Sequence, residues 1–307
     1  MAVSEPVISI RGLRKSYDEL EAVKGIDLEI FPEEIFAVLG PNGAGKTTTV
    51  EILEGYRSRD GGEVSVLGVD PARPTAAWRE RIGIVLQGTT LEPALTVRES
   101  LQQYAGYYRD PRDVDEVITL VGLEEQAGTR ARKLSGGQQR RLDVGIALVG
   151  DPDLLFLDEP TTGFDPSARR QAWEMVAGLR DLGKTVLLTT HYMEEAQVLA
   201  DRVAIISSGR IVALDTPDNL GDRRRQPSSI TFTVPAGTDL TGLAGTGQTL
   251  SHSDAGPEGR KVEIGTHEAV TDLNRITGWA IERGIDLEQL EVRRPSLEDV
   301  YLELTDA

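Results

Sequence analysis

The first part of the chain carries two patterns of apolar residues, each typical of a different kind of β-strand. Residues 7–10 and 26–30 alternate apolar and polar side chains, which predicts antiparallel strands with one exposed face. Residues 35–39 are apolar without interruption, as expected of a strand that a parallel sheet buries on both faces. Three more buried strands are predicted by apolar runs at 154–157, 185–190 and 203–206.

Helical patterns fall between these buried strands, at residues 169–182 and 193–200. Buried strands that alternate with helices predict an α/β fold with a doubly wound parallel sheet. Residues 96–149 are different, because they contain no convincing strand. We expect this stretch to form a helical insertion in the core, with helices at about 98–108, 113–121 and 137–148.

A second, smaller unit is expected after a basic linker at residues 223–229. Its strands are predicted at 230–234, 260–264 and 285–292, and residues 237–259 are expected to be mostly loop with one weak strand. One face of a predicted helix has apolar residues at helical spacing: Val270, Leu273, Ile276, Ala280 and Ile281. The chain would therefore consist of a domain at 1–222 and a small α+β domain at 228–307.

The end of the chain carries the pattern of a capped amphipathic helix. Ser296 and Asp299 have the spacing of a capping box, in which each side chain bonds to the other residue's backbone. The helix that follows would carry Leu297, Val300, Tyr301 and Leu304 on one face. This face implies a neighbouring surface that the helix covers.

Charge and composition exclude several classes of function. The formal net charge of −17 repels phosphate backbones, so we expect no nucleic-acid partner and no direct adsorption to an anionic membrane. The chain has no cysteine, which excludes disulfides, thiolate nucleophiles and cysteine-based zinc sites. Its N-terminus lacks the apolar region of a signal peptide, and its apolar runs have only strand length. We expect a cytoplasmic protein unless another molecule holds it at a membrane.

The strongest chemical motif follows the predicted strand at 35–39 and fits the P-loop pattern G-x-x-x-x-G-K-[ST]. Its small residues allow backbone N–H groups to turn inward around a β-phosphate, and the following helix adds its positive end. Lys46 would contact the β- and γ-phosphates, and the Thr47 hydroxyl would ligate Mg²⁺. The alternative is a glycine-rich turn with a chance lysine. The nucleotide-binding set is Gly40, Pro41, Asn42, Gly43, Ala44, Gly45, Lys46, Thr47 and Thr48.

Two carboxylates follow the apolar run at 154–157. Asp158 would lie at the carboxyl end of a parallel strand, where α/β sheets bind ligands, and would hold Mg²⁺ through water. Glu159 would be the general base that polarises the attacking water. A solvated turn is the alternative, although four buried residues do not usually precede such a turn.

A Ser-Gly pair opens the predicted helix at 137–148, within the segment Leu134, Ser135, Gly136, Gly137 and Gln138. A hydroxyl and free N–H groups at a helix N-terminus can bind an anion. An ordinary N-cap followed by glycine would explain the same residues.

Together with Gln87 and His191, these motifs make the chain resemble the ATP-binding subunits of ABC transporters over about residues 7–220. This resemblance implies a P-loop NTPase fold with a RecA-like sheet, an N-terminal antiparallel β subdomain and a helical subdomain at about 96–149. It also implies that Tyr17 stacks on adenine, that Gln87 ligates Mg²⁺ and senses the membrane subunit, and that His191 contacts the γ-phosphate. Lys46, Glu159 and His191 would be the catalytic residues, and Thr47, Gln87 and Asp158 the Mg²⁺ ligands.

By the same resemblance, the loop at 160–165, which ends at Asp165, crosses the interface between two copies of the chain. Two ATP molecules would be sandwiched between the copies, each bound by one P-loop and by Ser135, Gly136, Gly137 and Gln138 of the other copy. Thr162 and Phe164 depart mildly from the usual P-T-S-G-L-D form of the loop. The resemblance thus implies a homodimer that binds a separate integral-membrane permease.

The last residues narrow the resemblance. The segment at 295–302 is similar to the closing motif of the daunorubicin-resistance type of ABC ATPase, which belongs to bacterial multidrug exporters. This implies a membrane-peripheral exporter subunit, whose C-terminal domain would regulate or dimerise it. A non-transport ABC ATPase that acts on nucleic acid or the ribosome is an alternative, as is a binding module without turnover. Drug, lipid, polysaccharide and ion all remain open as substrates.

Overall fold

The computed structural model describes residues 5–88, 91–223, 226–241, 243, 249–254 and 259–305. Its internal contacts divide the chain into two compact units, Met1–Pro217 and Asp218–Asp306. Within the described residues, no helix is both long enough and apolar enough to span a bilayer.

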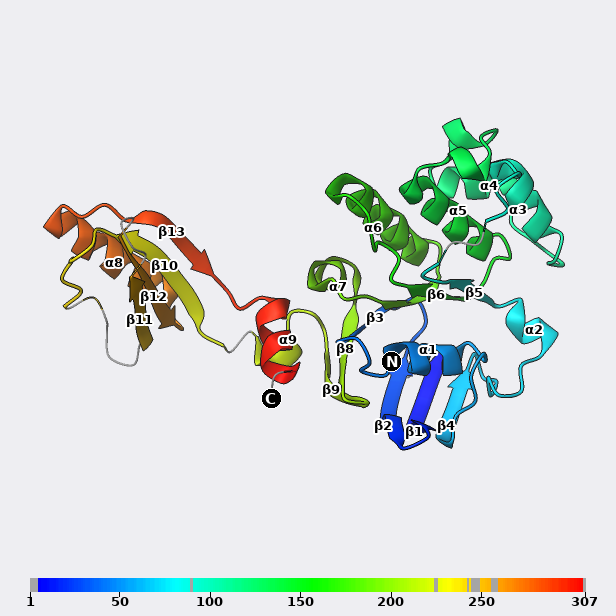
Figure 1. The fold of residues 1–307 in the computed structure, drawn as a ribbon, viewed down its shortest axis with the longest axis horizontal. Helices are drawn as coiled ribbons and strands as arrows, with labels where there is room; N and C mark the ends of the chain where they lie inside the picture. Colours follow the sequence, from blue (N-terminus) through cyan, green and yellow to red (C-terminus); the bar gives the residue numbers. More distant parts are fainter. Residues whose placement is uncertain are drawn as a thin grey trace. The chain divides into compact units, whose positions relative to one another are not determined.

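The first unit is built on a six-stranded sheet of which five strands are parallel (Figure 1). The sixth strand, β9, pairs antiparallel with β8. The strands follow in the order β5 (Ile82–Val85), β6 (Leu154–Asp158), β7 (Thr185–Thr189), β3 (Ile35–Leu39), β8 (Arg202–Ser207) and β9 (Arg210–Asp215). Every residue of β3 and β7 is buried, which confirms that continuous apolar runs form the interior of this sheet.

A second, antiparallel sheet in this unit has the strand order β2 (Leu20–Ile30), β1 (Ile8–Tyr17) and β4 (Gly61–Val66). The alternation predicted in this region is confirmed, because Ile8, Ile10 and Ile30 are buried while neighbouring polar residues face outward. These side chains share one hydrophobic core with Phe36 of β3 and Phe156 of β6. Helix α1 (Lys46–Leu53) contributes to the same core, so the P-loop lies against both sheets.

The predicted helical insertion is present. It contains α3 (Val97–Ala105), α4 (Val114–Leu120), α5 (Gly136–Leu148) and two short 3-10 turns, Glu124–Gln126 and Ala131–Lys133. In Figure 1 the three helices lie together, away from β1, β2 and β4. Helix α5 packs against β5 at Gly83, where a side chain would come within 2.6 Å of the Ala147 carbonyl oxygen. The remaining helices of the unit are α2 (Ala76–Arg79), α6 (Pro166–Asp181) and α7 (Met193–Leu199).

The second unit is a four-stranded antiparallel sheet with one long helix, α8 (Ala269–Arg283), against it. Its strand order is β11 (Thr249–Asp254), β12 (Arg260–Thr266), β10 (Ser228–Val234) and β13 (Glu288–Arg293). The weak strand predicted within 237–259 is therefore β11, while residues 242, 244–248 and 255–258 lie outside the described part. Arg224 and Arg225 of the predicted linker also lie outside it.

One detail of the predicted face of α8 is wrong. Val270 and Ile281 are 85% and 79% exposed, whereas Ile276 and Trp279 are buried against the sheet. At 100° per residue, Val270 and Ile281 point well away from the buried stripe centred on Ile276. Trp279, which the predicted face does not include, belongs to that stripe. The spacing of apolar residues alone therefore predicts a wider face than the one that the helix buries.

The last helix, α9 (Leu297–Thr305), begins with the predicted capping box. The Ser296 backbone N–H donates to Asp299 Oδ2 at 2.6 Å, and the Asp299 N–H donates to Ser296 Oγ at 3.1 Å. Leu297 and Val300 are buried, and Val300 packs on Gly221 of a 3-10 turn at Leu220–Asp222. The helix therefore covers another part of its own unit.

Candidate active site

The P-loop connects β3 to α1, and close backbone packing requires glycine at two of its positions, Gly40 and Gly45. Gly45 has a φ of 105°, and a Cβ there would lie 2.5 Å from the Ala22 carbonyl oxygen. A Cβ on Gly40 would overlap the Ile206 carbonyl oxygen. Larger residues at either position would displace the loop from the sheet, which explains why small residues stand there.

Lys46 is buried at the N-terminus of α1 and is held by the loop itself. Its Nζ donates to the Gly40 carbonyl at 2.7 Å and to the Pro41 carbonyl at 3.1 Å. Burial lowers the pKa of this ammonium group, while the negative charges of Glu159 and Asp158 oppose that shift. A buried cation that is held by neutral carbonyl groups at a helix N-terminus is well placed to bind a phosphate.

Asp158 and Glu159 lie at the carboxyl end of β6, as the sequence predicts. Asp158 Oδ1 accepts a hydrogen bond of 2.5 Å from the Thr189 hydroxyl at the end of β7. Glu159 leaves the strand with a φ of 45°, and its backbone N–H donates to the Thr189 carbonyl at 3.1 Å. This turn places both carboxylates at the same edge of the sheet as the P-loop.

Three side chains from different parts of the chain meet at one oxygen of Glu159. Gln87 Nε2 and the Thr162 hydroxyl each donate to Glu159 Oε2 at 3.0 Å. His191 Nδ1 lies 3.3 Å from the same oxygen, and its ring contacts the Tyr192 ring in a tilted arrangement, with centroids 4.1 Å apart. The structure thus brings together Gln87, Glu159 and His191, which lie up to 104 positions apart in the sequence.

Ser135 caps α5 and takes part in a reciprocal pair of bonds with Gln138. Ser135 Oγ accepts from the Gln138 N–H at 3.3 Å, and Gln138 Oε1 accepts from the Ser135 N–H at 2.9 Å. Asp165 caps α6 by accepting from the N–H groups of Ser167 and Ala168, both at 2.9 Å. Ser135 and Asp165 line a cavity of about 370 Å³ whose other lining residues include Gln87, Glu159, Gly136, Gly137 and Thr162.

In the described part of the chain, the cavity that Ser135, Gly136 and Gly137 line has no P-loop residue in its lining. Among the described residues, no hydrogen bond joins residues 40–48 to residues 135–138. Pro41, Asn42, Gly43 and Thr47 are exposed, whereas Ala44 and Gly45 are buried. Four residues of the P-loop are therefore accessible to a ligand from solvent.

Tyr17 lies beside the P-loop helix. Its hydroxyl is 3.4 Å from Thr48 Oγ1, and the Arg57 guanidinium lies 5.2 Å from its ring centroid. The ring is partly exposed, so a flat aromatic ligand can reach it.

The donor set fits a magnesium ion that is bound together with phosphate. Asp158 and Glu159 supply two carboxylates beside a single ammonium group, that of Lys46, and Thr47 adds an exposed hydroxyl. Such hard oxygen ligands suit Mg²⁺, which keeps several waters and usually shares its site with substrate phosphates. Among the described residues, no group of three or more His, Cys, Asp or Glu could hold a metal without such help.

Sequence reasoning missed two buried charged residues near this site. Arg140 donates from Nε to the Pro160 carbonyl at 3.3 Å, from Nη2 to the Asp158 carbonyl at 2.5 Å, and from Nη1 to the Leu86 carbonyl. It thereby joins α5 to the segments that carry Gln87 and Glu159. Its position two residues after Gln138 was the available signal, but nothing in the sequence showed its burial.

The second missed residue is Glu195 on α7, which is fully buried. Its Oε1 accepts from the Thr161 hydroxyl at 2.8 Å and from Trp173 Nε1 at 3.1 Å. Burial raises the pKa of this carboxyl, against the opposing effect of these hydrogen bonds. Glu195 connects the helix after His191 to the loop at 160–165 and to α6.

Comparison with known proteins gives consistent findings. A family profile described as ABC transporter matches residues 23–162, and one described as ABC transporter domain-containing protein-like, C-terminal domain matches residues 228–296. The chain is 36% identical to a daunorubicin resistance ATP-binding protein of Streptomyces coeruleorubidus, over 97% of this chain and 94% of that one. It is 37% identical to a Nod factor export ATP-binding protein of Paraburkholderia xenovorans, over 98% and 97%.

Solved structures are similar to the first unit. The CbiO1 subunit of Clostridium perfringens, part of the ABC transporter complex CbiONQ, superposes with a TM-score of 0.65 at 28% identity, over 70% of this chain and 90% of that one. A dimeric ATP-binding cassette in a post-hydrolysis state, bound to ADP and Pi, superposes with a TM-score of 0.61 at 25% identity, over 68% and 98%.

Proposed function

The chain belongs to the family of ABC transporter ATP-binding proteins, and from this membership we propose that it powers export through a separate membrane permease. It binds and hydrolyses ATP as the ATPase of a transport system. The relatives named above are described as resistance and export proteins, which favours transport over work on nucleic acid or the ribosome. The names of these relatives refer to a drug, daunorubicin, and to an exported factor, the Nod factor, so we propose a drug-like or similar small molecule as the exported substrate.

Glu159 acts as the general base in this proposal. The observation that carries it is the meeting of Gln87, Thr162 and His191 at Glu159 Oε2. Three polar neighbours orient one carboxylate oxygen, so that it can accept a proton from an attacking water at a fixed position. His191 would then contact the γ-phosphate from the adjoining strand end.

Lys46 and the N–H groups of the P-loop would bind the phosphates, and Tyr17 would stack on adenine. Thr47, Gln87 and Asp158 would hold Mg²⁺, which neutralises phosphate charge when bound. Lys46 would exchange its carbonyl partners for phosphate oxygens, whose negative charge makes stronger hydrogen bonds with the ammonium group. The chain's own contribution is therefore mainly to position and neutralise the phosphates.

A second copy of the chain would complete each site. Ser135, Gly136 and Gly137 line a cavity together with Glu159 of their own copy. Within the described residues, their segment makes no hydrogen bond to its own P-loop. Two copies facing each other would offer each P-loop the other copy's helix N-terminus. Asp165 and its loop would lie at this contact, and dimer closure would assemble the complete site. We also propose that the permease holds the dimer at the inner face of the membrane.

The variant Glu159→Gln tests this function. It should bind ATP with wild-type affinity, lose about 10²–10⁴-fold in turnover and accumulate as an ATP-bound dimer in gel filtration. The exposed neighbour Glu194 supplies a matched control, since Glu194→Gln should hydrolyse ATP at the wild-type rate. Near-wild-type turnover of Glu159→Gln, together with a monomeric elution profile, would contradict the assignment.

A further inference from the structure

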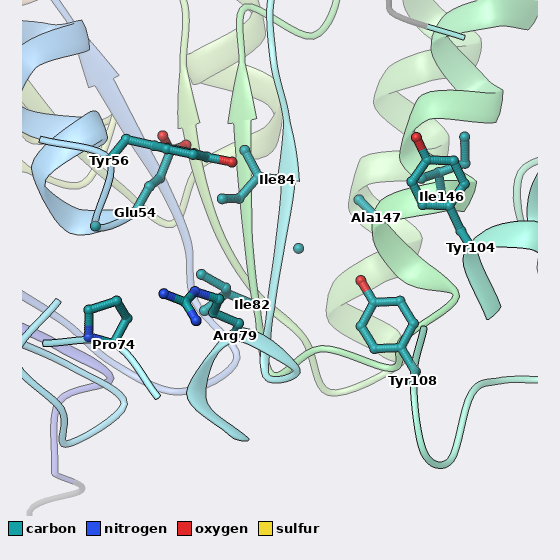
Figure 2. A pocket seen from close by; sticks show the side chains of 12 residues that line it. Glu54, Tyr56, Pro74, Arg79, Ile82, Ile84, Tyr104, Tyr108, Ile146 and Ala147 are labelled. Atoms are coloured by element: carbon teal, nitrogen blue, oxygen red, sulfur yellow. The ribbon is translucent and has the colours of Figure 1, made fainter. Parts of the chain in front are cut away.

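Two buried carboxylates of the first unit differ in their surroundings. Glu54 lies in the open groove that Figure 2 shows, together with Tyr56 and Ile84. It is 6% exposed, and within the described part of the chain its carboxylate forms no hydrogen bond and no ion pair. Glu195 of α7 is also buried, but it accepts hydrogen bonds and is attracted by the positive charge of Arg169. Only the second carboxylate therefore belongs to a network of polar groups.

Arg169 of α6 is held mainly by an aromatic ring. Its guanidinium carbon lies 4.3 Å from the centre of the Tyr192 ring, well within the range of a cation–π contact. Its Nε is buried without a hydrogen-bond partner, and its side chain forms no ion pair within the described residues. The ring face of Tyr192 and the charge of Glu195 compensate the guanidinium for the water that it has lost. Arg169 and Tyr192 therefore stabilise each other's position.

Tyr192 also contacts the ring of His191. The centroids of the two rings are 4.1 Å apart, and their planes are inclined at 40°. The Tyr192 N–H donates to Thr190 Oγ1 at 3.0 Å, which fixes the backbone across His191. Because the side chain of His191 is 43% exposed, close packing restrains it only in part. The contact with the Tyr192 ring and the approach of Nδ1 to Glu159 therefore matter for the orientation of the imidazole.

We propose that Arg169 is a positioning residue for His191 and that it acts through Tyr192. The proposal rests on the function proposed above, in which His191 contacts the γ-phosphate. With Nδ1 directed at Glu159, Nε2 is the ring nitrogen that remains for the phosphate, and a rotated ring would withdraw it. Arg169 lies on α6, outside the strand and helix that flank His191, so it supports the ring from a separate element.

Turnover and ATP affinity test the role of Arg169. Arg169→Met keeps a long side chain but removes the cation. It should lower kcat about 10- to 100-fold, because a small misplacement of a reacting group is costly. Its affinity for ATP should equal that of wild type, which will also show that the unit is folded. Arg170 is the exposed neighbour on α6, so Arg170→Met serves as the control and should hydrolyse ATP at the wild-type rate. Wild-type turnover by Arg169→Met would overturn the proposal.

A double-mutant cycle tests whether Arg169 acts through Tyr192. Tyr192→Leu removes the ring and should lose as much turnover as Arg169→Met, whereas Tyr192→Phe keeps the ring and should retain most of it. Arg169→Met added to Tyr192→Leu should cause no further loss, because the ring that it supports is already absent. Losses that multiply in the double variant would show two independent roles and would contradict the proposed route.

An NMR spectrum of the nucleotide-free protein tests the position of the His191 ring without ATP hydrolysis. The chain has three histidines, so isotope-labelled histidine gives three ring signals, and His191→Gln identifies the one from His191. A neighbouring aromatic ring shifts such a signal. The His191 signal should therefore move toward that of free histidine in Tyr192→Leu and in Arg169→Met, but not in Arg170→Met. An unchanged signal in Arg169→Met would refute the positioning role. If wild type hydrolyses no ATP, the proposed function fails, and this signal still decides whether Arg169 positions His191.

Discussion

Replacing Glu54 by glutamine should stabilise the nucleotide-free protein, and increasingly so as the pH rises. Burial, and then the negative charges of Asp158 and Glu51, raise the pKa of Glu54 from 4.5 to about 8. A carboxyl whose pKa is raised by folding stabilises the folded state below its unfolded pKa, and this contribution is lost as the pH rises through the folded pKa. From low pH to a pH above 8, the folded state loses about 5 kcal/mol of this stabilisation in all. About 2 kcal/mol of that loss takes place between pH 6.5 and 9.

The glutamine of Glu54→Gln does not titrate. The melting temperature of this variant minus that of wild type should therefore increase as the pH rises across this range. For a unit of this size, about 2 kcal/mol corresponds to an increase of roughly 4–8 °C in this melting-temperature difference. The assay is thermal unfolding of both proteins in EDTA at several pH values, with Glu63→Gln as the exposed control. A difference in melting temperature that stays constant or decreases as the pH rises would refute the reasoning.

Three further changes have definite expected outcomes. Glu195→Ala removes the acceptor of Thr161 and Trp173 and should cost about 1–3 kcal/mol of stability and lower turnover more than ATP affinity. Glu195→Gln should restore most of the turnover, because an amide oxygen can accept the same two hydrogen bonds. Steady-state kinetics with chemical denaturation will show whether the two variants differ. Gly45→Ala should weaken ATP binding by about 5–150-fold, as measured by equilibrium dialysis, because its Cβ meets the Ala22 carbonyl at a left-handed φ. A chain that ends at Pro217 should still bind ATP but form less dimer or permease complex; unchanged assembly would argue that the second unit has no such role.

Much of the fold follows from patterns that the sequence displays openly. The strands β3, β6, β7 and β8 are uninterrupted apolar runs, and the predicted bounds agree with the observed ones within about two residues. The helical insertion and the final capping box were also predicted from local spacing. These elements are recognisable because burial on both faces, or a capped amphipathic helix, leaves a strong local signature.

Other elements lack such a signature. The edge strand β9 alternates between half-buried and exposed positions, and β4 begins with two glycines, so neither resembles a buried strand. The four-residue strand β5 is too short to be recognised alone, although it supports Gln87. Its pairing with β6 is a long-range contact that only the folded chain reveals.

The residues of the site can also be divided into those that the sequence indicates and those that it does not. The resemblance to ABC ATPases singled out Gln87, Glu159 and His191, and the structure brings them to one carboxylate oxygen because their strands end at the same edge. Arg140 and Glu195 were missed because charged residues are usually exposed, and no local pattern distinguishes a buried one. Their partners are mainly backbone carbonyls and a hydroxyl on distant loops, which sequence spacing does not indicate.

The most direct test of the account is ATP hydrolysis by a mixed dimer. Lys46→Ala disables one P-loop, and Ser135→Arg places bulk and charge where the other copy's γ-phosphate should bind, so each variant alone should be inactive. Mixing them should restore hydrolysis, because each heterodimer retains one intact P-loop opposite one intact Ser135 segment. Heterodimers that form, as shown by differently tagged copies, but hydrolyse no ATP would contradict the shared site.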